Sequence, residues 1–165
     1  MKIRIAGTVN DSIVDGEGIR FTIFVQGCPH HCEGCQNPQT HDFNGGMIVD
    51  TDELLEKIKN NPLLDGVTFS GGEPFCHAAA LADMGRKIKA MGLDIITYTG
   101  YTFEELYANR DKNNWGELLD ITDYLVDGKF ELSLKSYNIR FRGSTNQRYL
   151  NCKESIKTGK AIKYL

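Results

Sequence analysis

The sequence has no apolar run of the roughly 20 residues that a membrane-spanning helix needs. Residues 1–5 contain no apolar stretch of the kind found in a signal peptide, and no repeat, low-complexity segment or linker follows. A net charge of −3 is too small to suggest nucleic acid as the main partner. We therefore expect one domain spanning residues 1–165, in the cytoplasm, with neither membrane nor nucleic acid as partner.

The net charge is small, but the charged side chains are unevenly distributed along the chain. Residues 1–128 carry 10 basic and 20 acidic side chains, whereas residues 129–165 carry 9 basic and 2 acidic ones, a balance of +7. Two interpretations stand side by side: a solvated segment that pairs with its own acidic domain, or a docking surface for an acidic partner. In the second case Arg140 and Arg148 are the candidate contacts, because a guanidinium holds a carboxylate through two hydrogen bonds.

The sequence has only five cysteines, and their number and spacing do not fit a disulfide framework. Five is an odd number, and three of the five lie within eight residues. Cys28, Cys32 and Cys35 are close enough in sequence to bind one metal centre, and thiolates suit iron–sulfur clusters and zinc alike. A structural zinc site needs a fourth ligand, which His30 or His31 could supply. An iron–sulfur cubane held by three cysteines would instead keep one iron open for a substrate.

Hydrophobic periodicity predicts alternating strands and helices, which is typical of a parallel sheet or part of a barrel. Helices are expected after an N-cap at Thr51, along one face that includes Leu81 and Met91, and after a capping box formed by Thr102 and Glu105. Residues 131–165 give no clear assignment. Strands are expected at residues 2–8, 19–26, 66–70, 93–99 and 124–127.

Four segments that could bind a ligand each follow a predicted strand. They are the cysteine loop, Gly71-Gly72-Glu73-Pro74, Thr99-Gly100 and Asp127-Gly128-Lys129. The carboxyl ends of parallel strands share one edge of a sheet, so we expect all four segments on one rim. Gly71 and Gly72 would let the backbone approach a ligand, and Pro74 favours an extended Glu73 whose carbonyl and carboxylate could accept from an ammonium group.

The spacing Cys28-x-x-x-Cys32-x-x-Cys35, followed by Gly-Gly-Glu-Pro after a later strand, resembles the radical S-adenosylmethionine superfamily. The resemblance implies an α/β fold: an incomplete (βα) barrel with parallel strands and outer helices. It also implies a 4Fe–4S cluster on the three cysteines, whose open iron binds S-adenosylmethionine, and reductive cleavage to a 5′-deoxyadenosyl radical. An aromatic residue often precedes the third cysteine in this superfamily. Gly34 stands there in this chain, which leaves adenine recognition to the backbone around Gly34, Cys35 and Gln36.

Residues 14–20 and 25–28 look like the front end of the glycyl-radical-enzyme activases within that superfamily. Thr99-Gly100-Tyr101, residues 126–130 and Arg142-Gly143-Ser144-Thr145-Asn146-Gln147 look like the branch that activates anaerobic ribonucleoside-triphosphate reductase. This resemblance runs from about residue 10 to residue 148. It implies that the substrate is a glycine in the large reductase subunit, which loses a hydrogen to leave a glycyl radical. Reduced flavodoxin or a similar donor would supply the electron.

Alternatives remain at the level of both function and residues. The chain could activate another glycyl-radical enzyme such as pyruvate formate-lyase, act on a small molecule like the carboxy-deazaguanine synthases, or only transfer electrons. Asp127 and Lys129 could contact the cofactor or form a salt bridge at a strand end. Cys76 could lie near the site, although a buried or idle thiol fits it better, and Cys152 has no assigned role.

Overall fold

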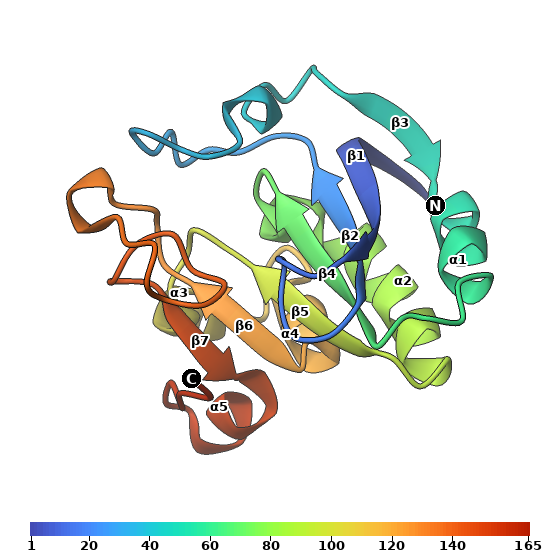
Figure 1. The fold of residues 1–165 in the computed structure, drawn as a ribbon. Coiled ribbons are helices and arrows are strands. Elements are labelled where there is room, and N and C mark those ends of the chain that lie inside the picture. The colour runs from blue at the N-terminus through green and yellow to red at the C-terminus, as the bar shows by residue number, and fades with distance from the viewer.

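The computed structural model describes residues 1–165, and its centre is a seven-stranded sheet in the order β3-β1-β2-β4-β5-β6-β7 (Figure 1). The inner strands β2, β4, β5 and β6 are parallel, whereas β1, β3 and β7 pair antiparallel. The expectation of parallel strands holds only for the inner four. A short loop joins β1 to β2, and a parallel pair would need a long crossover there. The strands are β1 (Lys2–Ser12), β2 (Arg20–Val25), β3 (Met47–Asp50), β4 (Gly66–Gly71), β5 (Asp94–Tyr98), β6 (Tyr124–Asp127) and β7 (Arg148–Asn151).

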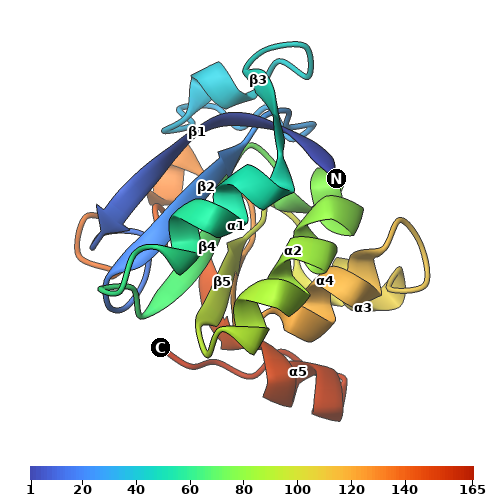
Figure 2. The same cartoon turned by 90° about the vertical axis from the view of Figure 1, so that its right-hand side faces the viewer.

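Helices cover only one face of this sheet, as Figures 1 and 2 show for α1 to α4. A core of 27 buried residues fills the space between the sheet and these helices. The opposite face has a smaller buried cluster, Ile96, Val126 and Tyr149. No helix has both the length and the apolarity needed to cross a membrane. The helices are α1 (Thr51–Lys59), α2 (Ala78–Ala90), α3 (Phe103–Ala108), α4 (Trp115–Ile121) and α5 (Cys152–Thr158), with 3-10 turns η1 (Pro38–Thr40), η2 (Pro74–His77) and η3 (Leu132–Leu134).

Local sequence signals are confirmed at some helix ends and wrong at others. Thr102 and Glu105 form the expected capping box at α3. Asp50, not Thr51, caps α1, because the Asp50 carboxylate accepts from the amide of Asp52 while Thr51 is buried inside the first turn. Met91 is 39% exposed at the end of α2 rather than part of its buried face.

The segments that sequence reasoning missed are β3, α4, β7 and α5. Strand β3 lies at the sheet edge and exposes Met47 and Ile48, so it has no apolar alternation to detect. Strand β7 has only four residues and is placed by pairing with β6, which is about 20 residues away in sequence. These elements exist because of tertiary contacts, which a local pattern does not record.

A buried ion pair fastens β7 to the end of β6. The Asp127 carboxylate is 1% exposed; it accepts from the Phe103 amide at 2.7 Å and from Nε of Arg148 at 3.0 Å. Arg148 also donates to Glu104 at 2.6 Å. Of the two roles considered for Asp127, the salt bridge is the one present. Arg148 holds the fold together here, so for this residue the structure favours the first interpretation of the basic segment, pairing with the chain's own acidic side chains.

Arg148→Ala should lower the free energy of unfolding by about 2–3 kcal/mol, because it leaves a buried carboxylate without its cation. The value lies below that of a fully buried pair, since the Arg148 side chain is 28% exposed. Urea denaturation measures it. Arg140→Ala is the matched control: Arg140 is exposed and in no salt bridge, so the change should stay within about 0.5 kcal/mol. Equal stability of the two variants would contradict the role given to Arg148.

Candidate active site

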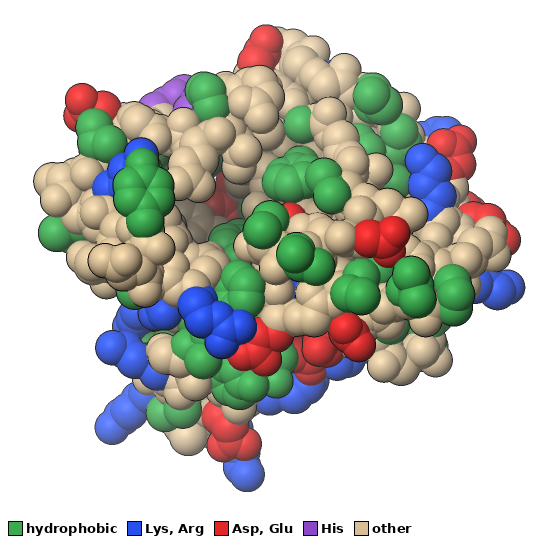
Figure 3. Space-filling view, in the orientation of Figure 1, with side chains coloured by type: hydrophobic (Ala, Val, Ile, Leu, Met, Phe, Trp, Pro, Cys, Tyr) green, Lys and Arg blue, Asp and Glu red, His purple; other side chains and the backbone are tan.

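A hollow lies on the sheet face that no helix covers, at the carboxyl ends of the inner strands (Figure 3). Its volume is about 550 Å³. All four segments predicted to share a rim contribute to its lining, so that prediction is confirmed. Their contributions are Cys28, Cys32 and Cys35 from the cysteine loop, Gly71 and Gly72 from the turn after β4, Thr99 and Gly100 after β5, and Gly128 after β6.

Three thiols therefore face one cavity from a single loop. Backbone bonds hold the loop at both ends: the Cys28 amide donates to the His41 carbonyl at 3.2 Å and the Cys35 amide to that of Cys32 at 3.2 Å. Burial raises the pKa of Cys28 to about 11 and also raises that of Cys32. A bound cationic metal would stabilise the thiolate form of these cysteines.

The arrangement of these side chains suits a cluster better than one metal ion. No group of three His, Cys, Asp or Glu side chains converges on a single ion position. Zinc requires such convergence by four ligands, and neither histidine is placed for it: His30 is bonded to Glu73, and His31 packs against His41. In a 4Fe–4S cluster each thiolate binds a different iron, so three thiols spaced around one cavity fit.

Gly71 and Gly72 line the cavity, and their lack of a side chain also has a structural reason that the sequence did not reveal. A Cβ on Gly72 would collide with the carbonyl oxygen of Gly27 and stand 3.0 Å from that of Thr40. A Cβ on Gly71, whose φ is +94°, would lie 2.6 Å from the Val25 amide nitrogen. The glycines thus let the turn pack against the chain that leads into the cysteine loop. Both glycines also line the cavity, so the expectation that their backbone approaches a ligand stays a prediction.

Glu73 is also placed differently, since its side chain is fully buried and does not line the cavity. Oε1 accepts from His30 Nε2 at 2.6 Å and from the Gly100 amide at 2.7 Å. Oε2 accepts from Thr99 Oγ1 at 2.8 Å and from the Phe75 amide at 3.0 Å. The carbonyl of Glu73 accepts from the Cys76 amide. The predicted exposed carboxylate is therefore wrong, and Glu73 ties neighbouring segments together.

Other predicted site residues divide between the cavity and its surroundings. Gln36 and Thr99 line the cavity, whereas Gly34 does not, and a Cβ there would stand 2.9 Å from Leu132 Cδ1. Lys129 and Asp127 line a smaller polar hollow of about 430 Å³ next to it, so neither reaches the main cavity.

The two remaining cysteines lie outside the cavity lining. Cys76 is exposed on η2. Cys152 is buried under α4, with Sγ 3.5 Å from the Leu119 carbonyl, and burial raises its pKa to about 12.

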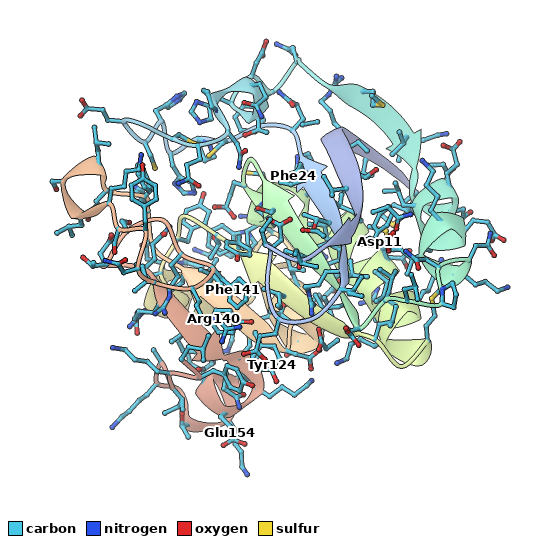
Figure 4. All side chains as sticks on the ribbon, viewed as in Figure 1. Asp11, Phe24, Tyr124, Arg140, Phe141 and Glu154 are labelled. Atoms are coloured by element: carbon cyan, nitrogen blue, oxygen red, sulfur yellow. The ribbon has the colours of Figure 1, made fainter.

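Several cavity residues escaped sequence reasoning, including Phe24, Tyr98 and Phe141, and His30 was considered only as a zinc ligand. Figure 4 shows Phe24 from β2 and Phe141 from the segment before β7, which come together only in the folded chain. Arg142 and Gln147 also line the cavity, and both lie in the Arg-Gly-Ser-Thr-Asn-Gln stretch. Positive φ at Phe141 (65°) is the kind of special backbone conformation often found at functional sites.

A family model described as a 4Fe-4S single cluster domain matches residues 14–150. The anaerobic ribonucleoside-triphosphate reductase-activating proteins of Pasteurella multocida and Salmonella typhimurium are 35% and 37% identical, over 82% of this chain and 89% and 90% of theirs. The chain belongs to this family. A third activating protein, from Enterobacteria phage T4, is 33% identical over 82% of this chain and 85% of its own. The similarity to the activating-protein family therefore spans bacterial and phage relatives.

Among solved structures, QueE from Escherichia coli superposes with a TM-score of 0.52 over 62% of this chain and 54% of that one, just over half of its length. The sequence identity is 19%, so this likeness concerns the fold alone. This chain thus shares part of its mixed α/β fold with that structure.

Proposed function

We propose that this protein activates anaerobic ribonucleoside-triphosphate reductase by reductive cleavage of S-adenosylmethionine at a 4Fe–4S cluster. The observation that carries this conclusion is the convergence of three thiols and three other strand-end segments on one cavity, in a chain of the activating-protein family. The small-molecule alternative draws support only from a likeness in fold, and the names of the relatives favour a protein substrate.

Within this proposal, Cys28, Cys32 and Cys35 hold the cluster. S-adenosylmethionine occupies the cavity of about 550 Å³, against the backbone of Gly71 and Gly72. Gln36 and Thr99 lie at its edge. When bound, the cluster supplies the electron that breaks the carbon–sulfur bond and thereby yields the radical that takes hydrogen from a glycine. The chain's own residues bind and orient the cofactor.

A glycine of the large reductase subunit needs a route into the cavity, and its mouth offers one. Val9 and Val14 are exposed and line it, and Phe130, which also lines it, leads into a segment with exposed apolar side chains at Leu132, Leu134 and Tyr137. Exposed apolar patches of this kind mark protein interaction sites. We propose that residues 1–165 form one domain, an incomplete (βα) barrel whose open side admits the partner. A reduced flavodoxin or similar protein would donate the electron.

The test is anaerobic reconstitution of the cluster followed by measurement of 5′-deoxyadenosine after reduction, with and without the reductase. We expect single-turnover cleavage without the partner, and a glycyl-radical signal by electron paramagnetic resonance when it is added. No cleavage by the reduced protein would overturn the radical chemistry. Cleavage without any glycyl radical on the reductase would overturn the partner.

The basic C-terminal segment supports a docking role, once Arg148 is excluded. Arg140 is exposed beside Phe141 at the cavity (Figure 4), and Lys135 is exposed near Tyr137. Neither forms a salt bridge. We propose that these two residues steer an acidic surface of the reductase towards the cavity.

Lys135→Glu combined with Arg140→Glu should slow glycyl-radical formation about tenfold at low salt, because electrostatic steering acts on the association rate. Cleavage of S-adenosylmethionine without the reductase should stay unchanged. The matched control is Lys157→Glu with Lys160→Glu, the same change of charge at the end of α5 and just after it, and Figure 1 places α5 at the far end of the molecule. Equal slowing in both variants would show a general charge effect and contradict local docking.

A further inference from the structure

The cysteine loop is joined to the rest of the cavity through one histidine that the chemistry proposed above does not use. His30 lies between Cys28 and Cys32, and its side chain is only 6% exposed. Its Nε2 bonds to Oε1 of Glu73, and it is the only basic side chain that forms an ion pair with this fully buried carboxylate. A hydrogen bond with an ionised partner is among the stronger ones. The loop that carries the thiols is thus attached to the Gly-Gly-Glu-Pro turn by a side chain.

The same carboxylate extends the attachment to the end of β5. Thr99 donates its hydroxyl and Gly100 its amide to Glu73. The ring of Tyr101 packs edge-on against His30, with centroids 4.6 Å apart. A Cβ on Gly100 would lie 2.7 Å from Nε2 of His30 and closer still to the ring carbon Cδ2. Gly100 is therefore needed for the histidine to sit where it does.

We propose that His30 is a positioning residue: through Glu73 it holds the three thiols in register with the turn and the β5 end that line the other side of the cavity. This rests on the proposed function, because it is the shared cofactor cavity that makes the register matter. Thr99-Gly100-Tyr101 then has a physical purpose. Thr99 orients Glu73, Gly100 leaves space, and Tyr101 supports the ring.

Two variants and a neighbouring control test this position. His30→Ala removes the link, and His30→Gln restores a donor at nearly the reach of Nε2. His31→Asn changes the adjacent histidine, which makes no hydrogen bond to Glu73 and whose φ of 51° asparagine tolerates. The first measurement is amide hydrogen exchange in the protein without a cluster, at Cys28 and Gly100, whose amides are bonded to His41 and to Glu73. The second is equilibrium binding of S-adenosylmethionine to the reconstituted protein, with iron content measured alongside.

We expect His30→Ala to speed exchange at both amides about tenfold while the amides of α2 stay protected, because only the local attachment is lost. Binding of S-adenosylmethionine should weaken about tenfold, the scale on which supporting residues act at metal sites. Iron content should remain, since all three thiols do. His30→Gln should recover most of both losses, and His31→Asn should match the wild type. Unchanged exchange and binding in His30→Ala, or equal losses in His31→Asn, would overturn the proposal.

If the amides of α2 also exchange rapidly in His30→Ala, that variant is unfolded, and the test is then the comparison of His30→Asn with His30→Gln. Both side chains are polar, but only glutamine is long enough to reach Glu73. Binding of S-adenosylmethionine by His30→Gln but not by His30→Asn supports the proposal, and equal binding by the two variants overturns it. Failure of the wild type to bind S-adenosylmethionine would contradict the proposed function instead, while hydrogen exchange would still report on the attachment.

Discussion

Alanine at any one of Cys28, Cys32 or Cys35 is expected to abolish both the absorption of the 4Fe–4S cluster and the formation of 5′-deoxyadenosine. The three thiols face one cavity, and no other cysteine lines it. A cluster that loses one of three protein ligands has two open irons and no thiolate close enough to replace the missing one. Anaerobic reconstitution, iron analysis and absorption spectra of the three variants measure the effect.

Cys76→Ala and Cys152→Ala are the matched controls for these substitutions. Cys76 is exposed on η2, and Cys152 is buried against α4, well away from the cavity lining. Both variants should keep full iron content. Cys152→Ala should cost about 1 kcal/mol of stability, because it removes one buried sulfur atom from the core. Loss of the cluster in Cys76→Ala would contradict ligation by three cysteines with an open iron.

Gly72→Val should prevent cluster incorporation and lower the free energy of unfolding by about 2–3 kcal/mol, because a branched side chain must fit where the backbone is already in contact. Its Cβ would overlap the carbonyl oxygen of Gly27, which accepts from the Glu73 amide at 2.8 Å. The Gly27 amide in turn donates to Thr40 at 2.7 Å. The substitution therefore forces the turn away from the start of the cysteine loop. Denaturant unfolding and iron content measure the two effects.

Gly7→Val is the control for this prediction, since a Cβ on Gly7 would meet no atom within 4 Å. Both changes place the same side chain on a strand or at its end, so a general effect of valine would appear in both. Gly7→Val should keep the cluster and change stability by no more than about 0.5 kcal/mol. A Gly72→Val protein that binds a full cluster but binds S-adenosylmethionine weakly would show instead that the glycine mainly makes room for the ligand.

Much of the cavity could be predicted from sequence because its parts follow strands. The cysteine spacing, the two glycines and Thr99-Gly100 each come directly after a buried strand, and the topology of parallel strands brings such segments to one edge. The capping box at Thr102 and the strand at Tyr124–Asp127 were equally local signals. Such features can be predicted without knowledge of the fold, because each depends only on residues that are close together in the sequence.

The partners of buried polar groups could not be predicted in this way. Asp127 and Arg148 are 21 residues apart in the sequence, and His30 and Glu73 are 43 residues apart. The local sequence around one member of each pair does not indicate the other member. A buried carboxylate must accept all of its hydrogen bonds from donors within the protein. Its partners are therefore set by which segments surround it in the fold. The sequence by itself thus predicted that three thiols share one cavity and at which edge of the sheet they lie. Only the tertiary structure decided that Glu73 points inward to His30 and that Arg148 belongs to the fold, since both follow from contacts between distant segments.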